Sequence, residues 1–106
     1  MKVKASELSG VALHWAVAHC KGLVQGQIAI DGVTQGFYNP STDWAQGGPI
    51  IEEERIDTNT SYPSTWVATC HDGSKTCTGP TPLIAAMRCF VASKLGDEVD
   101  IPEELI

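Results

Sequence analysis

The sequence predicts an α+β fold in which three helices pack on a small, largely antiparallel sheet. Two observations support this class: three segments carry apolar residues at helical spacing, and short β-branched runs bounded by turn residues lie between them. At 106 residues the chain is long enough for one hydrophobic core and too short for two. We therefore predict a single α+β domain over residues 1–96, followed by an acidic C-terminal arm over residues 97–106.

The first helix is predicted over residues 9–21, where apolar residues recur at helical spacing. These residues are Leu13, Ala16, Val17 and Cys20. Gly22 provides a natural end, because glycine readily adopts the left-handed conformation that often follows a helix. Trp15 lies away from the centre of the apolar stripe, so we interpret it either as a residue at the core boundary or as a ring at the edge of a ligand groove.

Short apolar runs interrupted by glycines follow this helix. Residues 27–30 and 31–34 are predicted to form a hairpin in which a strand, a turn and a second strand succeed one another. Tyr38 and Pro40 then interrupt regular structure, because proline cannot continue a hydrogen-bonded ladder.

The second helix is predicted over residues 42–56. Ser41 or Thr42 is expected to open it, because a side-chain oxygen at the N-cap accepts a hydrogen bond from a free backbone N–H. Asp43 is then favourably placed in the first turn, where the helix dipole attracts negative charge.

Three consecutive residues, Gly47, Gly48 and Pro49, weaken this second helix. Each glycine costs about 1 kcal/mol relative to alanine, and an internal proline removes a hydrogen bond. Either residues 42–46 form a single turn and a new helix begins at Pro49, or one bent helix leaves its glycines in close contact with a neighbour. That neighbour is a packed helix in one interpretation and a bound ligand in the other.

Residues 57–65 are predicted to be a polar connection that leads into a second hairpin. The β-branched and aromatic residues of 65–70 favour a strand, and residues 75–78 are expected to be its antiparallel partner. If Gly73-Ser74 forms a two-residue turn, Cys70 lies opposite Cys77, whereas a turn on Asp72-Gly73 would misalign the two sulfurs.

The four cysteines are expected to be free thiols, because the predicted compartment is reducing. Cys20 and Cys89 lie in apolar helical patterns and are interpreted as small core residues. A zinc site could be assembled from Cys70, His71 and Cys77, with His19 and Cys20 as further candidates, but the chain has no Cys-x-x-Cys motif and no regular histidine spacing. We therefore predict no metal and a simple cross-strand thiol pair.

The third helix is predicted over residues 82–95 and is the most strongly patterned element. Thr81 is its expected N-cap, and Pro82 occupies the first helical position, where a missing N–H costs nothing. Arg88 lies on the same helical face as Thr81. It is interpreted either as a clamp for a carboxylate or phosphate or as a member of a surface salt bridge.

Charge and hydropathy exclude several classes of protein. The net charge of −6, with seven scattered basic residues, disfavours direct nucleic-acid binding. The apolar runs are too short to span a membrane, and no secretion signal opens the chain, so a cytoplasmic location is expected. The histidines accompany no nucleophile motif, so we expect no catalytic residues, no cofactor and no enzymatic activity.

Several blocks of sequence point to a family. The long blocks are YNPSTDWAQGGPII at residues 38–51 and GPTPLIAAMR at residues 79–88, and shorter ones lie at 7–10, 13–18 and 66–68. Together they resemble the small NinX-like proteins of lambdoid phages and prophages, a family of unknown function. The resemblance implies a small α-β-α sandwich and an accessory product of a phage early region that acts in the bacterial cytoplasm.

The residues of the two long blocks favour a binding protein. Helix N-termini with small and capping residues can hold a phosphate, and aromatic rings can stack on a base. The first hypothesis is a sponge-like binder that sequesters a small, phosphate-bearing, nucleotide-type host signalling molecule and so acts in counter-defence. The candidate ligand-binding residues are the aromatic, capping, small and basic residues Trp15, Tyr38, Pro40, Ser41, Thr42, Asp43, Trp44, Gly47, Gly48, Pro49, Trp66, Thr81 and Arg88.

An alternative is a protein-interaction factor that blocks a host enzyme through an acidic surface. A pocket between the helix starts at Trp44 and Thr81 would favour the first hypothesis, and a flat acidic face would favour the second. The sequence also leaves a homo-oligomer open.

Overall fold

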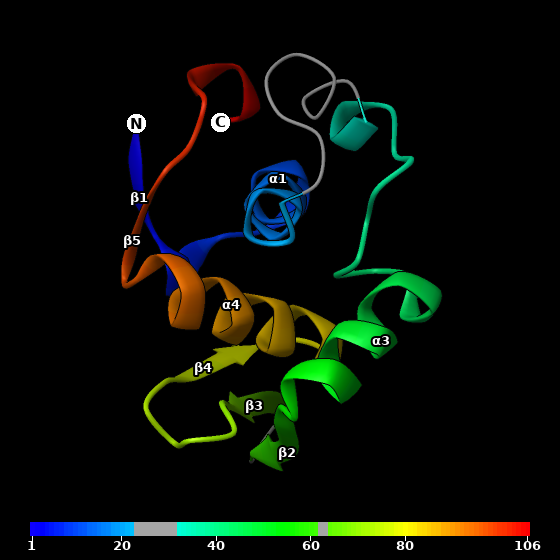
Figure 1. Cartoon of the computed structure of the whole chain (residues 1–106), viewed down its shortest axis with the longest axis vertical. Helices are drawn as coiled ribbons and strands as arrows, with labels where there is room; N and C mark the ends of the chain where they lie inside the picture. The colour runs from blue at the N-terminus through cyan, green and yellow to red at the C-terminus, as the bar shows by residue number, and fades with distance from the viewer. Residues whose placement is uncertain (23–31, 62–63) are drawn as a thin grey trace.

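The computed structural model describes residues 1–22, 32–61 and 64–106 and has the predicted α+β class (Figure 1). Its elements in chain order are β1 (Lys2–Lys4), the 3-10 helix η1 (Ala5–Glu7), α1 (Gly10–Cys20), α3 (Trp44–Glu54), β2 (Asp57–Ser61), β3 (Thr65–Thr69), β4 (Thr76–Gly79), α4 (Pro82–Leu95), β5 (Glu98–Asp100) and the 3-10 helix η2 (Glu103–Leu105). The three predicted helices are confirmed by α1, α3 and α4, and the strands of the second hairpin by β3 and β4.

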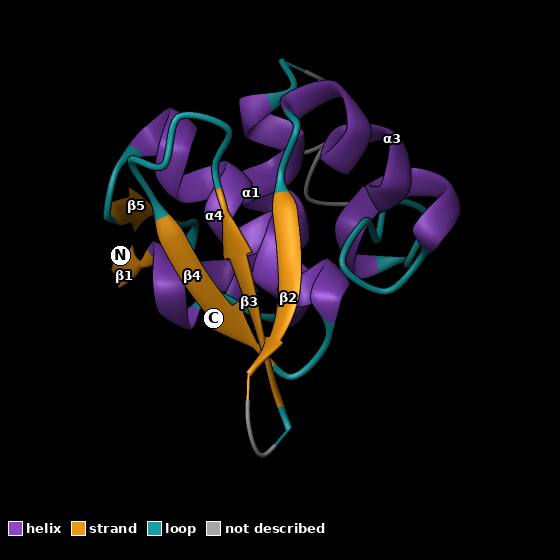
Figure 2. Ribbon diagram, turned by 90° about the horizontal axis from the view of Figure 1, so that it is seen from below, coloured by secondary structure: helices purple, strands orange, loops and turns teal. Residues whose placement is uncertain are grey.

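The sheet, α4 and α1 form successive layers (Figures 1 and 2). β2, β3 and β4 are antiparallel neighbours in that order, and one face of their sheet packs on α4. α1 packs on the other side of α4, and α3 lies against its flank. Alternate residues of β4 are buried and exposed, because the outer face of the sheet meets water. Among the described residues, this layer order differs from the helix-sheet-helix order of the α-β-α sandwich that the resemblance implies.

The core is organised around α4, which contacts both the sheet and α1. Its buried side chains are Leu83, Ala85, Ala86, Met87, Cys89, Phe90, Val91 and Ala92. Small residues alternate with large ones along the helix, so neighbouring elements can approach it closely from several directions. A helix that is apolar on most of its circumference must be covered on all those sides, and this explains its central position.

The predicted polar connection over residues 57–65 is wrong, because Asp57–Ser61 forms strand β2. β2 pairs with β3 at the edge of the sheet, with Thr58 opposite Ala68 and Thr60 opposite Trp66. An edge strand is half solvated, so it can consist of polar residues provided that some are β-branched. Thr58 and Thr60 are the β-branched residues that indicate a strand, although the segment as a whole is polar.

The predicted pairing of Cys70 with Cys77 is also wrong. In the observed register Ala68 lies opposite Cys77 and Thr69 lies opposite Thr76. The turn is therefore centred on Asp72-Gly73, where Gly73 has a φ of +75°. The Asp72 carboxylate accepts a hydrogen bond from the Ser74 N–H (2.9 Å), which fixes this turn. The shift places Cys70 opposite Lys75, and the Cys70 N–H donates a hydrogen bond to the Lys75 carbonyl.

Residues 32–34 are helical, so the predicted strand over this part of the first hairpin is wrong. Residues 27–31, the rest of that hairpin, lie outside the described residues. The helical turn ends in a Schellman motif: the Gly36 N–H bonds the Val33 carbonyl, and the Phe37 N–H bonds the Gly32 carbonyl. Gly36, with a φ of +80°, is therefore a helix stop rather than part of a hairpin.

Residues 97–106 lie on the N-terminal part of the same chain. β5 pairs with β1, with Val99 opposite Val3, and the Ala5 N–H donates to the Asp97 carbonyl. Ile101 and Leu105 are buried in the core. The acidic segment is thus anchored by its few apolar residues, and the two ends of the chain lie close together (Figure 1).

Candidate functional site

The N-termini of α3 and α4 converge on one hollow at the surface. Its volume is about 250 Å³, and it is lined by Ser41, Thr42, Trp44, Thr81, Pro82, Leu83 and Ile84. Thr81 is the N-cap of α4, as predicted, and its hydroxyl accepts the Ile84 N–H at 3.1 Å. The two sequence blocks therefore meet in space, and this hollow is the candidate binding site.

Gly47 makes the convergence possible. A Cβ atom at Gly47 would overlap the Pro40 carbonyl oxygen and would lie 2.6 Å from Leu83 Cδ2. Only a glycine allows α3 to approach both the preceding loop and the start of α4 so closely. Pro40 is itself buried beneath this contact.

α3 is one continuous helix that contains Pro49 in its interior. This observation decides between the two predicted arrangements in favour of one helix with a glycine in close contact. The contact is with the protein itself, at Gly47. A methyl group at Gly48 would have only Trp44 Cε3 nearby, at 3.9 Å, and Pro49 is exposed.

Asp43 is the N-cap of α3, so the expectation that Ser41 or Thr42 caps this helix is wrong. One Asp43 carboxylate oxygen accepts the Ala45 N–H at 3.0 Å. The other accepts a hydrogen bond from the side-chain amide of Gln46 at 3.1 Å. Gln46 also exchanges hydrogen bonds with Asn39, which ties the loop before the helix to its first turn. Gln46 is thus a structural residue of the site that sequence reasoning missed.

Ser41 is unavailable as a cap because its hydroxyl is bound to His14 of α1. His14 Nε2 lies 2.5 Å from Ser41 Oγ, and the two residues are only 6% and 3% exposed. Burial lowers the pKa of His14 below its usual value, so the ring is neutral at neutral pH. His14 Nδ1 has no hydrogen-bond partner among the described residues. Ser41 lines the hollow, and within the described residues no carboxylate orients the His14 ring, so the pair lacks the third member of a catalytic triad.

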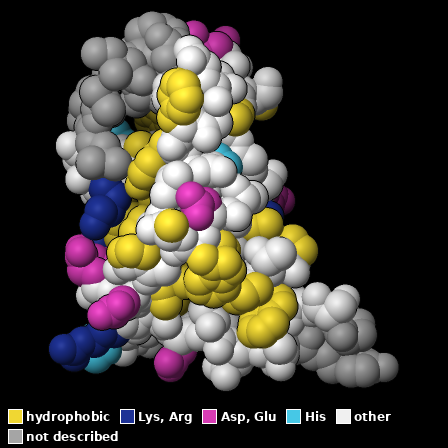
Figure 3. Space-filling view, turned by 90° about the vertical axis from the view of Figure 1, so that its right-hand side faces the viewer, with side chains coloured by type: hydrophobic (Ala, Val, Ile, Leu, Met, Phe, Trp, Pro, Cys, Tyr) yellow, Lys and Arg dark blue, Asp and Glu magenta, His cyan; other side chains and the backbone are white. Residues whose placement is uncertain are grey.

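Trp44 forms an exposed aromatic wall beside the hollow. It is 57% exposed although it is the first residue of α3. Figure 3 shows hydrophobic side chains gathered on one face of the molecule, with acidic side chains dispersed among them. An exposed indole next to an apolar hollow is a surface suited to a flat ring.

A sequence model of the family described as Bacteriophage P22, NinX matches residues 4–94. The chain belongs to the NinX family. The match spans both helix starts of the hollow and ends within α4, before the segment that contains β5. Membership makes the chain a phage accessory protein. No curated protein matches the chain significantly.

Three predicted aromatic site residues do not line the hollow. Trp15 stacks on His19 of the same helix, with ring centroids 5.1 Å apart and planes 9° from parallel. Trp66 is half-buried in β3, and Tyr38 is half-buried against the core. Burial raises the pKa of the Tyr38 hydroxyl. The stacked pair and the partial burial account for these rings without a ligand.

Arg88 of α4 joins β4 to the segment between η1 and α1. Its Nε donates to the Leu8 carbonyl at 2.7 Å, and its Nη1 donates to the Thr78 carbonyl at 2.8 Å. Both acceptors are backbone oxygens, so these contacts are neither the predicted anion clamp nor a salt bridge. Arg88 is absent from the lining of the hollow.

The described part of the chain contains no group of three or more histidine, cysteine or acidic side chains placed to hold a metal ion. The zinc alternative therefore has no ligand set within residues 1–22, 32–61 and 64–106. None of the helices described there combines the length and apolarity that a membrane crossing requires.

Proposed function

We propose that this NinX-family protein is a non-enzymatic accessory protein that sequesters a small nucleotide-type molecule in the bacterial cytoplasm. The observation that supports this most is the hollow between the starts of α3 and α4, with Trp44 exposed beside it. The hollow takes the base, and Trp44 stacks on its face.

The size and lining of the hollow favour a single ring. Its volume is about 250 Å³. Sites that enclose a whole ligand usually measure about 300–1,000 Å³. A base would therefore occupy the hollow, and the sugar and phosphate would extend over the rim. Pro82, Leu83 and Ile84 line the hollow together with Trp44 and give it apolar surface.

The phosphate is expected on the α4 side of the hollow. A helix N-terminus carries a partial positive charge of about half an elementary charge, so it attracts an anion without a basic side chain. At the start of α3 the carboxylate of Asp43 already occupies this position. At the start of α4 the cap is the neutral hydroxyl of Thr81, which leaves the attraction for phosphate intact.

The acidic-surface alternative receives less support from the described side chains. Four of the acidic groups are in ion pairs: Glu53 with Lys21, Glu54 with Lys94, Asp97 with Lys75, and Asp100 with the N-terminal ammonium. These pairs reduce the negative potential that would imitate a nucleic acid. Binding of a host protein is the alternative result that the experiment below can detect.

The experiment begins with native mass spectrometry of the protein taken from phage-infected cells, which detects a co-purifying small molecule. Isothermal titration calorimetry with AMP, cyclic AMP and cyclic dinucleotides then measures affinity. Trp44→Ala should weaken binding about fivefold or more, because base stacking contributes about 1–3 kcal/mol. Phe37→Ala is the matched control, since Phe37 is 75% exposed and does not line the hollow.

The proposal fails if no nucleotide co-purifies and none of these probes binds. It also fails if Trp44→Ala and Phe37→Ala bind a probe as tightly as the unaltered protein. Co-purification of a stoichiometric host protein, with no small molecule, would favour the alternative.

A further inference from the structure

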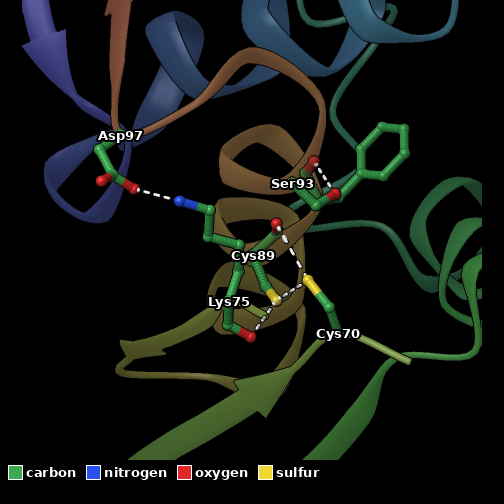
Figure 4. Close-up of polar contacts among 6 residues, drawn as sticks. Cys70, Lys75, Cys89, Ser93 and Asp97 are labelled. Carbon is green, nitrogen blue, oxygen red and sulfur yellow. Dashed lines mark hydrogen bonds and ion pairs between the residues drawn. The ribbon is translucent and has the colours of Figure 1, made fainter. Parts of the chain in front are cut away.

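Two cysteine thiols from different elements face each other at a second hollow. Cys70 follows the end of β3, and Cys89 lies in the middle of α4. Their sulfur atoms are 3.0 Å apart (Figure 4). A disulfide bond is about 2.0 Å long, so the sulfurs need to move only about 1 Å to bond.

The surroundings distinguish the two thiols. Cys70 is half-buried and lines a hollow of about 220 Å³ together with Glu54, Ile56, His71, Asp72, Ser74, Ser93 and Lys94. Cys89 is fully buried and is absent from that lining. A small solute therefore reaches Cys70 first, and Cys89 lies directly behind it.

Cys89 is held in place as a thiol. Its Sγ lies 3.5 Å from the Lys75 carbonyl oxygen, which accepts the S–H, and burial raises its pKa. A protonated, buried thiol is a poor nucleophile toward a solute. Cys77 is not part of this thiol pair, because it lies opposite Ala68 in the sheet.

We propose that Cys70 and Cys89 are a redox-reactive pair, in which a peroxide that enters this hollow oxidises Cys70 and Cys89 then closes a disulfide. The proposal is independent of the proposed ligand, because the two hollows share no lining residue.

The chemistry balances in two steps. The Cys70 sulfur attacks one oxygen of hydrogen peroxide, the O–O bond breaks, and the products are a sulfenic acid on Cys70 and one water. The Cys89 sulfur then attacks the Cys70 sulfur, the S–O bond breaks, and the thiol proton of Cys89 leaves with that oxygen as a second water. Two thiols lose two electrons in total, and one peroxide is reduced to two waters.

The test treats the reduced full-length protein with hydrogen peroxide, alkylates the remaining thiols and maps the peptides without reduction. Two of the four thiols should become inaccessible, and the map should contain a Cys70–Cys89 cross-link with the loss of two hydrogens. Retention of all four thiols would overturn the proposal. A cross-link that joins any other pair would also overturn it.

Variants then test the order of the two steps. In Cys89→Ala the cross-link should disappear, and dimedone should trap a sulfenic acid on Cys70. Cys77→Ala is the matched control and should still form the Cys70–Cys89 link.

If Cys89→Ala does not fold, Cys70→Ser serves instead, because Cys70 is only half-buried. At the same peroxide concentration Cys70→Ser should leave Cys89 unmodified. Dimedone labelling of Cys89 in that variant would contradict the order in which Cys70 reacts first.

Discussion

Gly47 of α3 lies against Leu83 of α4 so closely that a methyl group at Gly47 would overlap the leucine side chain, with 2.6 Å between Cβ and Cδ2. The contact joins the two helix starts that form the hollow. It also explains why a helix-weakening residue occupies the interior of α3.

Gly47→Ala should lower the free energy of unfolding by about 1–3 kcal/mol, the usual cost of overpacking a filled site. Gly48→Ala is the neighbouring control. Its new methyl group would make only an ordinary van der Waals contact with Trp44, so the better helix propensity of alanine should raise stability by up to about 1 kcal/mol. Urea unfolding followed by circular dichroism measures both. Equal effects of the two substitutions would refute the close contact.

Arg55 ends α3 in the left-handed conformation, with a φ of 53°. Its N–H bonds the Glu52 carbonyl and the Ile56 N–H bonds the Ile51 carbonyl, as in a Schellman motif. Arg55→Gly should stabilise the protein by about 1 kcal/mol, because glycine adopts this conformation without strain. Arg55→Ala removes the same side chain and keeps the strain, so it should give no gain. Thermal unfolding of the pair provides the comparison.

Arg88→Ala should destabilise the fold by about 2 kcal/mol, because two backbone carbonyl groups lose a charged donor. Nucleotide affinity of the folded variant should be unchanged, since Arg88 does not line the hollow. Lys94→Ala, which removes a surface ion pair with Glu54, should cost less than about 1 kcal/mol. Chemical denaturation and calorimetry together check this prediction. A large loss of affinity with unchanged stability would restore the anion-clamp interpretation of Arg88.

His14 should make stability depend on pH. Its folded-state pKa is lowered from 6.5 by burial, so the unfolded chain binds the proton more readily. The contribution to stability is therefore complete above pH 6.5 and is lost as the pH falls from 6.5 toward the lower folded-state pKa. Urea unfolding measured across this pH range should show that the free energy of unfolding declines as the pH falls. His14→Gln should reduce this decline. The exposed His71 is the control, and His71→Gln should keep the full decline.

The sequence patterns predict the three helices well, because each has several apolar residues at helical spacing and a clear glycine, proline or capping residue near an end. They cannot select the cap of α3. Ser41, Thr42 and Asp43 all have suitable side chains, and the choice depends on the distant His14, which binds Ser41. The meeting of the two helix starts depends similarly on a contact between Gly47 and Leu83 that no local pattern encodes.

The strands are harder to predict, because a difference at a single residue can change which residues pair or whether a strand forms at all. Moving the turn by one residue, to Asp72-Gly73, replaces the expected Cys70–Cys77 pair with a contact between Cys70 and the distant Cys89. The pattern around Gly36 indicates a break beside a hairpin, whereas this glycine ends a helical turn. Both glycines have a positive φ, and a positive φ serves a hairpin turn and a helix end equally well.

The pairing of β1 with β5 has a consequence for synthesis of the protein. Val3 leaves the ribosome long before its partner Val99, which follows only after every other described strand and the helices down to Leu95. The first strand therefore remains unpaired during most of translation, and the backbone of Ala5 lacks its acceptor at Asp97 until then. A nascent chain arrested before residue 98 would lack the strand that pairs with β1 and would leave this edge open to chaperones and proteases.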